Sequence, residues 1–208
     1  MKGLILKDFY CLKKYMKQLV MILICLGVWG IMMKSSTYIL FMISMFASMT
    51  VLTTMAYDEK SQVNKYLLAG PTSRWEIVIG KFASWLVTIT AAVAIELLLG
   101  FLMMNYYSTP GNDLLISILE TNSVYIILFS ILIPICYKIG VERARIMMFV
   151  IFLIPTAIII FFANYSKADP VIIDALIQNM MILLPISAII ILAASIIISI
   201  QIVEKKEF

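Results

Sequence analysis

Few side chains of this chain could do covalent chemistry, and the segment that comes nearest to a nucleotide-binding motif does not match that motif. The 208 residues include no histidine, which excludes a serine–histidine pair and a zinc site of the HExxH type. A phosphate-binding loop needs glycine, four residues and then Gly-Lys-Ser/Thr, because backbone amides must surround the phosphates and a hydroxyl must hold magnesium. Here Gly80 and Lys81 precede Phe82, and Trp75 occupies the first glycine position. We therefore expect no enzyme activity and no bound cofactor or metal on this chain.

Two carboxylates in or beside apolar segments are the remaining chemical candidates. Glu96 lies in the run TAAVAIELLLGF, and Glu120 lies at the outer end of the next apolar segment. An ionised carboxylate facing lipid costs several kcal/mol, so Glu96 should carry a proton or face a wet cavity or a dimer seam. One interpretation places both residues on a translocation pathway that attracts cationic amphipathic peptides. The other makes Glu96 a hydrogen-bonded packing residue.

These carboxylates sit in a chain that is 63% hydrophobic, which is more apolar surface than a soluble domain of this size can bury. Crossing a hydrocarbon core ~30 Å thick takes about 20 apolar residues. Six segments come near this length, and they lack the alternating polarity of barrel strands, so they predict helices. The six predicted spans lie near residues 19–33, 38–56, 82–104, 121–137, 146–163 and 181–203.

The distribution of basic residues predicts the orientation. If both termini are cytoplasmic, 14 of the 16 basic residues lie inside and only Lys34 and Lys167 lie outside, as expected for a multi-pass protein of the plasma membrane. Attraction to anionic lipid accounts for the net charge of +4 without a nucleic-acid partner. Trp75 and Trp85 flank the start of the third predicted span, where we expect them to anchor it at the interface.

Two short segments outside the spans have helical patterns. Residues 1–17 place apolar side chains, among them Phe9 and Leu12, at helical spacing between lysines. This pattern predicts an interfacial helix with its apolar face on the lipid. Residues 164–180 carry Pro170 where a helix would begin, and they predict a separate short helix at the outer surface.

The cytoplasmic loop of residues 57–81 has the most patterned polar sequence. Asp58 and Glu59 are expected to open a short helix, since carboxylates favour a helix N-terminus, and a glycine–proline pair then ends it. Ser73 and Glu76 have the spacing of a capping box, which predicts the start of the third span. The loop should therefore hold a short surface helix between two spans.

A series of short motifs runs through this loop into the third predicted span. They are Tyr57-Asp58-Glu59-Lys60, Tyr66, Pro71-Thr72-Ser73-Arg74, Ile77-Val78 and Lys81-Phe82. This pattern resembles the loop between the second and third spans of small bacterial type 2 ABC exporter permeases (ABC-2), particularly the membrane subunits of phenol-soluble modulin exporters. The opening GLILKDFYCLKK, the length and the six-span plan also resemble that family over the whole chain. Val63 departs from a tryptophan that is frequent in the family, and Gly70 departs from a leucine.

The resemblance implies an all-α integral membrane protein with six transmembrane helices, an N-terminal interfacial helix and a cytoplasmic coupling helix. Its partner would be a separate cytosolic ATPase that binds ATP and magnesium. A homodimer of permeases with two ATPase copies is expected, because twelve helices can surround a shared pathway. The cargo would be amphipathic peptides similar to phenol-soluble modulins or antimicrobial peptides. The implied ATPase-coupling residues are Asp58, Glu59, Lys60, Tyr66, Arg74 and Trp75.

Two other functions stay open from the sequence. An ion-gradient-driven secondary transporter should have clustered ionisable residues or broken helices near mid-membrane, and the predicted spans offer only Glu96. A non-catalytic immunity or scaffold protein of the membrane would need no ATPase.

Overall fold

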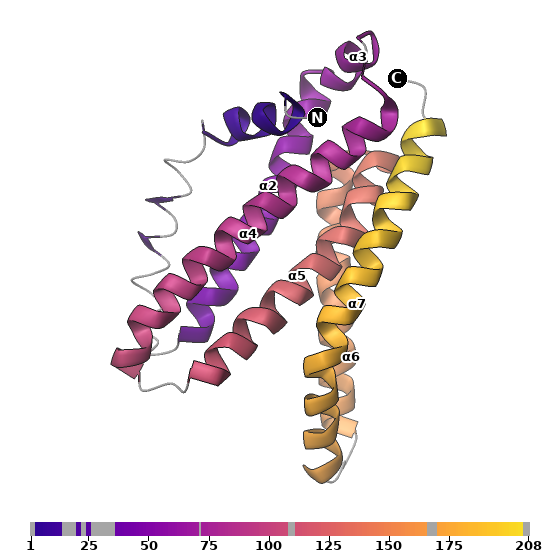
Figure 1. Ribbon diagram of the computed structural model, residues 1–208. Coiled ribbons are helices and arrows are strands. Elements are labelled where there is room, and N and C mark those ends of the chain that lie inside the picture. The colour runs from indigo at the N-terminus through magenta and orange to yellow at the C-terminus, as the bar shows by residue number, and fades with distance from the viewer. Residues whose placement is uncertain are drawn as a thin grey trace.

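All regular structure in the described part of the chain is helical (Figure 1). The computed structural model describes residues 3–13, 20–21, 24–25, 36–70, 72–107, 111–165 and 170–205. An N-terminal helix covers residues 3–13. The helices that follow it are α2 (Ser36–Lys60), α3 (Val63–Leu68), α4 (Arg74–Tyr107), α5 (Gly111–Ile139), α6 (Val141–Tyr165) and α7 (Pro170–Lys205).

Four helices among the described residues are long and apolar enough to cross a membrane. They are Tyr38–Lys60, Arg74–Leu102, Asp113–Ile139 and Leu183–Lys205, which contain most of the second, third, fourth and sixth predicted spans. The first predicted span, residues 19–33, lies almost entirely outside the described residues. Residues 146–163 fall within α6, which is not among the four. The all-helical membrane class is confirmed, and the count of six spans stays a prediction.

The end of α2 differs from the expected boundary. Asp58 and Glu59 do not open the short helix; they belong to the last turn of α2, because nothing before Lys60 breaks that helix. The turn comes at Gln62, whose backbone is left-handed (φ 50°, ψ 32°) and whose N–H donates to the Glu59 carbonyl at 3.2 Å. The short helix α3 then starts at Val63.

Gln62 stands where glycine is usual, because a side chain in left-handed backbone costs ~1–2 kcal/mol. We expect Gln62→Val to lower the free energy of unfolding by about 1–2 kcal/mol relative to Gln62→Gly, since a branched side chain fits this conformation worst. Melting temperatures of the two purified variants in detergent would measure the difference. Equal melting temperatures would contradict the left-handed turn.

The expected separate outer helix in residues 164–180 is also wrong. Pro170 begins a helix, as predicted, but α7 continues from it to Lys205 as one element. The sequence explains this continuity, because residues 171–184 contain no glycine or proline that would end a helix.

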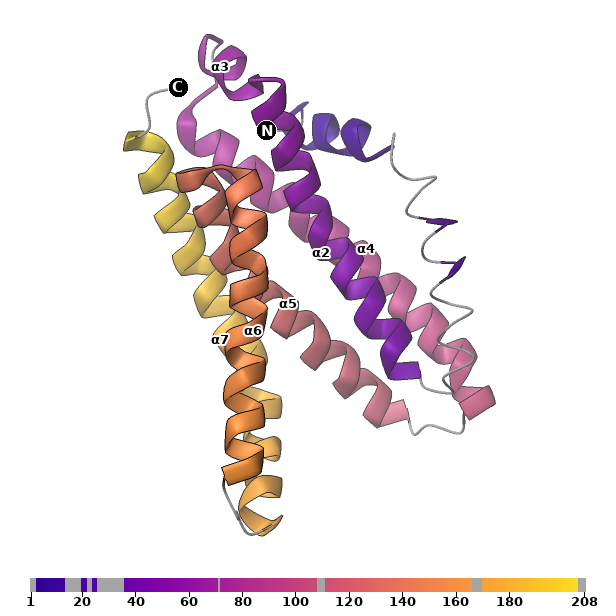
Figure 2. The ribbon, with the colours of Figure 1, turned by 180° about the vertical axis from the view of Figure 1, so that it is seen from behind.

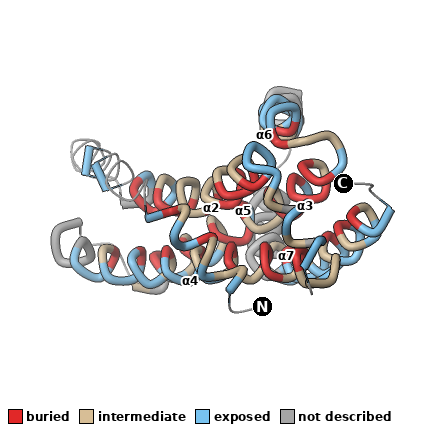
Figure 3. Tube along the Cα trace, turned by 90° about the horizontal axis from the view of Figure 1, so that it is seen from above, coloured by how far each residue is buried: buried red, intermediate tan, exposed pale blue. Residues whose placement is uncertain are grey.

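The core lies where α2, α4, α5 and α7 face one another. Trp85 and Phe129 are almost completely buried there, with ring centroids 6.3 Å apart, so Trp85 is a core residue rather than an interfacial anchor. Viewed along the bundle, α4 has buried positions on its side towards α2 and α5 and exposed ones opposite (Figure 3). Helix α6 is peripheral, and among its described side chains only Val141 and Ala144 are buried.

The N-terminal helix, α3 and the last turn of α7 lie at the same end of the bundle, which we call the α3 end (Figures 1 and 2). The turn between α5 and α6 also lies at this end (Figure 2). This arrangement is the one expected if these segments share the cytoplasmic side. Their assignment to the cytoplasm still depends on the distribution of basic residues.

Candidate functional site

A buried network of charges joins three helices at the α3 end. Lys81 of α4 donates to Asp8 of the N-terminal helix (Nζ–Oδ1 2.8 Å) and to Asp58 of α2 (Nζ–Oδ2 2.6 Å). Lys7 contacts the other Asp58 oxygen at 2.6 Å and Asp8 at 3.4 Å. The Ser84 hydroxyl, one turn after Lys81, donates to Asp8 at 2.7 Å. We call Lys7, Asp8, Asp58 and Lys81 the ion network.

The ion network is electrically neutral, and three of its four side chains are buried. The side chains of Asp8, Lys81 and Asp58 are 3%, 5% and 8% exposed. An isolated charge buried to this extent would lose far more free energy of hydration than it could regain, whereas paired and hydrogen-bonded charges are tolerated. The network therefore fixes how the N-terminal helix, α2 and α4 meet.

Sequence reasoning assigned no role to Asp8 or Lys81. One signal could have revealed the first, because Asp8 is the only acidic residue before Asp58 and it stands among lysines. The N-terminal helix turns Asp8 and Leu12 inwards and leaves Phe9 partly exposed. Its inward face therefore differs from the purely apolar face that the sequence predicted, and its interfacial position stays a prediction.

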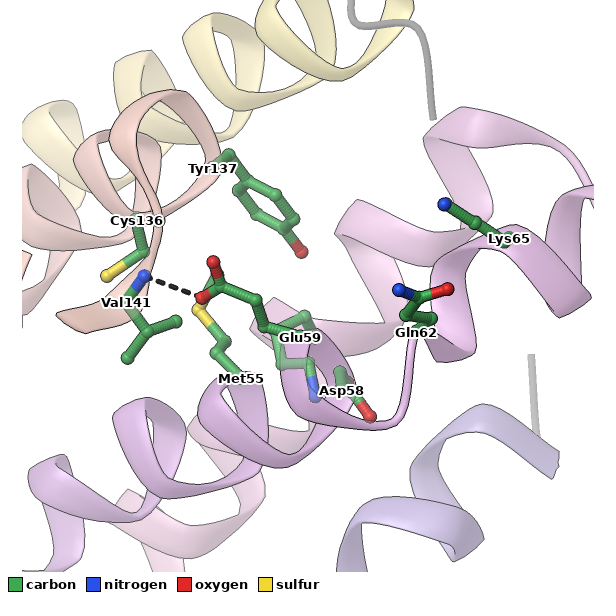
Figure 4. Close-up of a pocket in the computed structure, with 10 residues that line it drawn as sticks. Met55, Asp58, Glu59, Gln62, Lys65, Cys136, Tyr137 and Val141 are labelled. Atoms are coloured by element: carbon green, nitrogen blue, oxygen red, sulfur yellow. Dashed lines mark hydrogen bonds and ion pairs between the residues drawn. The ribbon is translucent and has the colours of Figure 1, made fainter.

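Glu59 reaches in another direction, to the start of α6 (Figure 4). Its Oε2 accepts a hydrogen bond from the Val141 N–H at 2.7 Å. Gly140, between α5 and α6, has φ +89°, and a Cβ there would lie 2.7 Å from the other Glu59 oxygen. Beside this contact is a cavity of about 140 Å³, lined mainly by the end of α2, the loop to α3 and the end of α5.

Arg74 closes the end of α7. Its Nη1 donates to the carbonyls of Val203 at 3.1 Å and Glu204 at 2.5 Å. Carbonyls in the last turn of a helix lack partners within the helix, and a cation there also complements the helix dipole. Arg74, which is the first residue of α4, thus joins α4 to the C-terminal end of α7.

The other predicted coupling residues face outwards. Tyr66 on α3 is 77% exposed, Trp75 at the start of α4 is 46% exposed, and Lys60 is exposed at the end of α2. The part of the capping box in which the Ser73 N–H donates to Glu76 Oε2 is present at 3.0 Å. The six predicted coupling residues therefore divide into an exposed set (Lys60, Tyr66 and Trp75) and a set that ties helices together (Asp58, Glu59 and Arg74).

Glu96 is completely buried between three helices. Ser44 of α2 donates to its Oε1 at 2.5 Å, and Asn122 of α5 donates to its Oε2 at 2.7 Å. Glu120 is half-buried and lies two residues before Asn122, on a different face of α5. The structure therefore pairs Glu96 with Ser44 and Asn122, and does not join it to Glu120.

The comparisons with known proteins agree with this architecture. A family model described as ABC-2 family transporter protein matches residues 3–204. No curated protein and no solved structure matches the chain. The match confirms the resemblance to ABC-2 permeases, while the narrower resemblance to phenol-soluble modulin exporters remains a hypothesis. Since nearly the whole chain is matched, this protein belongs to the ABC-2 transporter family, as a membrane transport component that is not itself catalytic.

Proposed function

We propose that this chain is the permease of an ATP-driven exporter in a bacterial plasma membrane, and that α3 with the start of α4 receives a cytosolic ATPase. Family membership supports an ATPase partner, because ABC-2 permeases generally work with one. The ATPase would bind ATP and magnesium, and this chain would supply the pathway.

The observation that carries the proposal is that Tyr66 and Trp75 are exposed next to helix ends that are joined by ion pairs and hydrogen bonds. Both aromatic side chains project from the α3 end, and aromatic residues are frequent among the residues that dominate binding energy at interfaces. The ion network and Arg74 hold the ends of α2, α4 and α7 beneath them. A partner that binds these aromatic residues would push on helices that are already joined.

The assembly and the cargo follow from the family resemblance. We infer a homodimer with two ATPase copies, because a twofold pair of permeases suits two identical motors. Amphipathic peptides, such as phenol-soluble modulins or antimicrobial peptides, are the proposed cargo. The hydrogen bonds of Glu96 favour a packing role for this residue. The alternative is that its charge lies on the translocation pathway.

The docking proposal predicts that Tyr66→Ala with Trp75→Ala weakens ATPase binding. The neighbouring reading frame is expected to encode a soluble protein with a phosphate-binding loop, and this protein would be co-expressed with the tagged permease. We expect the affinity between them to fall at least ~10-fold, which corresponds to ~1.4 kcal/mol. The measurement is a titration of the purified ATPase onto the permease in detergent.

The matched control is Tyr38→Ala, which removes an exposed tyrosine near the other end of α2 and should leave the affinity unchanged. If the double variant binds the ATPase as tightly as the unchanged permease, the docking surface is wrong. If the permease moves amphipathic peptides without any ATPase, the exporter proposal itself fails.

A further inference from the structure

Two consecutive acidic residues at the end of α2 contact different helices. Asp58 belongs to the ion network with the N-terminal helix and α4, whereas Glu59 contacts the first residue of α6. Neighbouring residues of a helix do not face the same side, so one short segment can hold two separate partners. The segment that leads into α3 therefore contacts the N-terminal helix and α4 through the ion network, and α6 through Glu59.

The position of Glu59 is explained by α6 rather than by α2. A carboxylate in the last turn of a helix opposes that helix's dipole, whereas the same charge at a helix N-terminus is favourable. The Val141 N–H is one of the amides that α6 cannot satisfy internally. Gly140 provides access, because any larger residue would place a Cβ 2.7 Å from a Glu59 oxygen.

At the α3 end, α6 is also held by its one-residue connection to α5 and by the buried side chains of Val141 and Ala144. Its described side chains after Ala144 are all half-buried or exposed. Glu142 and Arg145 at its start pair only loosely, at 3.8 Å. The cavity beside Glu59 gives the carboxylate room to change position.

We propose that Glu59 is a positioning residue that passes movement of α3 to α6, so that ATPase docking displaces α6 together with α2 and α4. The part that this link plays in transport rests on the proposed function. The link between α3 and α6 can be tested on the permease alone, without an ATPase. Losing it should free α6 from α3 without removing the exposed surface to which the ATPase binds.

The first test uses the full permease alone in detergent. Spin labels at the exposed positions Tyr66 and Ile146 report the distance between α3 and α6, after Cys11, Cys25 and Cys136 have been replaced by serine. We expect a narrow distance distribution in the parent protein and a clearly broader one in Glu59→Ala.

Two further variants separate the contact from its charge. Glu59→Gln keeps an oxygen that can accept from Val141, so we expect its distribution to resemble the parent protein. Glu142→Ala removes the same charge from the same helix end, at a side chain that is 86% exposed, and should also leave the distribution narrow. An unchanged distribution in Glu59→Ala would overturn the inference.

The second test measures transport by the permease reconstituted with its ATPase in lipid vesicles. Glu59→Ala is expected to keep ATPase affinity but to move about tenfold less peptide per ATP hydrolysed, a factor in the usual range for coupling between sites. A normal ratio of transport to hydrolysis would overturn the transport role of Glu59. If the parent complex shows no ATP-dependent transport, the proposed function is wrong, and the spin-label distances still decide the link between α3 and α6.

Discussion

Replacing Lys81 with methionine is expected to lower the free energy of unfolding by about 3–5 kcal/mol, because it leaves two buried carboxylates with one partly exposed lysine. Asp8 would lose both contacts with Lys81, and Asp58 would lose its contact with Lys81 but keep the one with Lys7. Methionine retains most of the volume of the lysine stem, so the loss reports charge rather than packing. This is among the two largest effects that we expect from a single substitution.

Cys136 offers a direct measurement of this loss. Its side chain is buried, so it should react with a maleimide only when the bundle opens. Heating the protein with the reagent, after Cys11 and Cys25 have been replaced by serine, would give the melting temperature. Lys65→Met is the matched control, because Lys65 is exposed on α3 and its loss should change little.

A double variant tests whether charge balance is the cause. Asp8→Asn combined with Lys81→Met leaves the neutral pair of Lys7 and Asp58, so it should recover part of the stability lost in Lys81→Met alone. The ion network would have no stabilising role if Lys81→Met melted at the same temperature as Lys65→Met.

The second large effect is expected at Glu96. Glu96→Ala should cost about 2–4 kcal/mol, because it opens a cavity, removes the acceptor of the buried Ser44 hydroxyl and removes one of the two acceptors of the Asn122 amide. The same heating experiment with Cys136 as the reporter would measure the loss. Leu98→Ala is a suitable control, since Leu98 lies on the same helix and is exposed.

Glu96→Gln separates the packing role from the charge. The glutamine oxygen can accept from Asn122, while its amide can donate to the Ser44 hydroxyl. We therefore expect this variant to be as stable as the unchanged protein and to transport peptide at the same rate. A stable Glu96→Gln variant with impaired transport would instead place the carboxylate on the pathway.

The sequence predicted the long helices from α2 to α7 because each of them contains a long apolar run. It also predicted the start of α4, since the capping box of Ser73 and Glu76 is a local pattern. The end of α2 was less predictable. Carboxylates usually favour the start of a helix, and only the contacts of Asp58 and Glu59 with other helices explain their position in a last turn.

The site was harder to predict because its contacts join distant parts of the chain. Arg74 was assigned to coupling from a loop pattern, but its hydrogen bonds go to carbonyls 129 and 130 residues later. Trp85 is a residue type common at membrane interfaces, yet the approach of Phe129 places it in the core. Glu96 was recognisable as a buried charge, whereas Ser44 and Asn122 became visible as its partners only in the folded bundle.

The pairing of Asp8 with Lys81 also bears on the order in which this protein is built. The two residues are 73 positions apart, and a chain is synthesised from its N-terminus. Until Lys81 has been made and α4 has entered the bilayer, Asp8 lacks its main partner and should stay in contact with water. The N-terminal helix is therefore synthesised before α4 but reaches its final position only after α4 is in place.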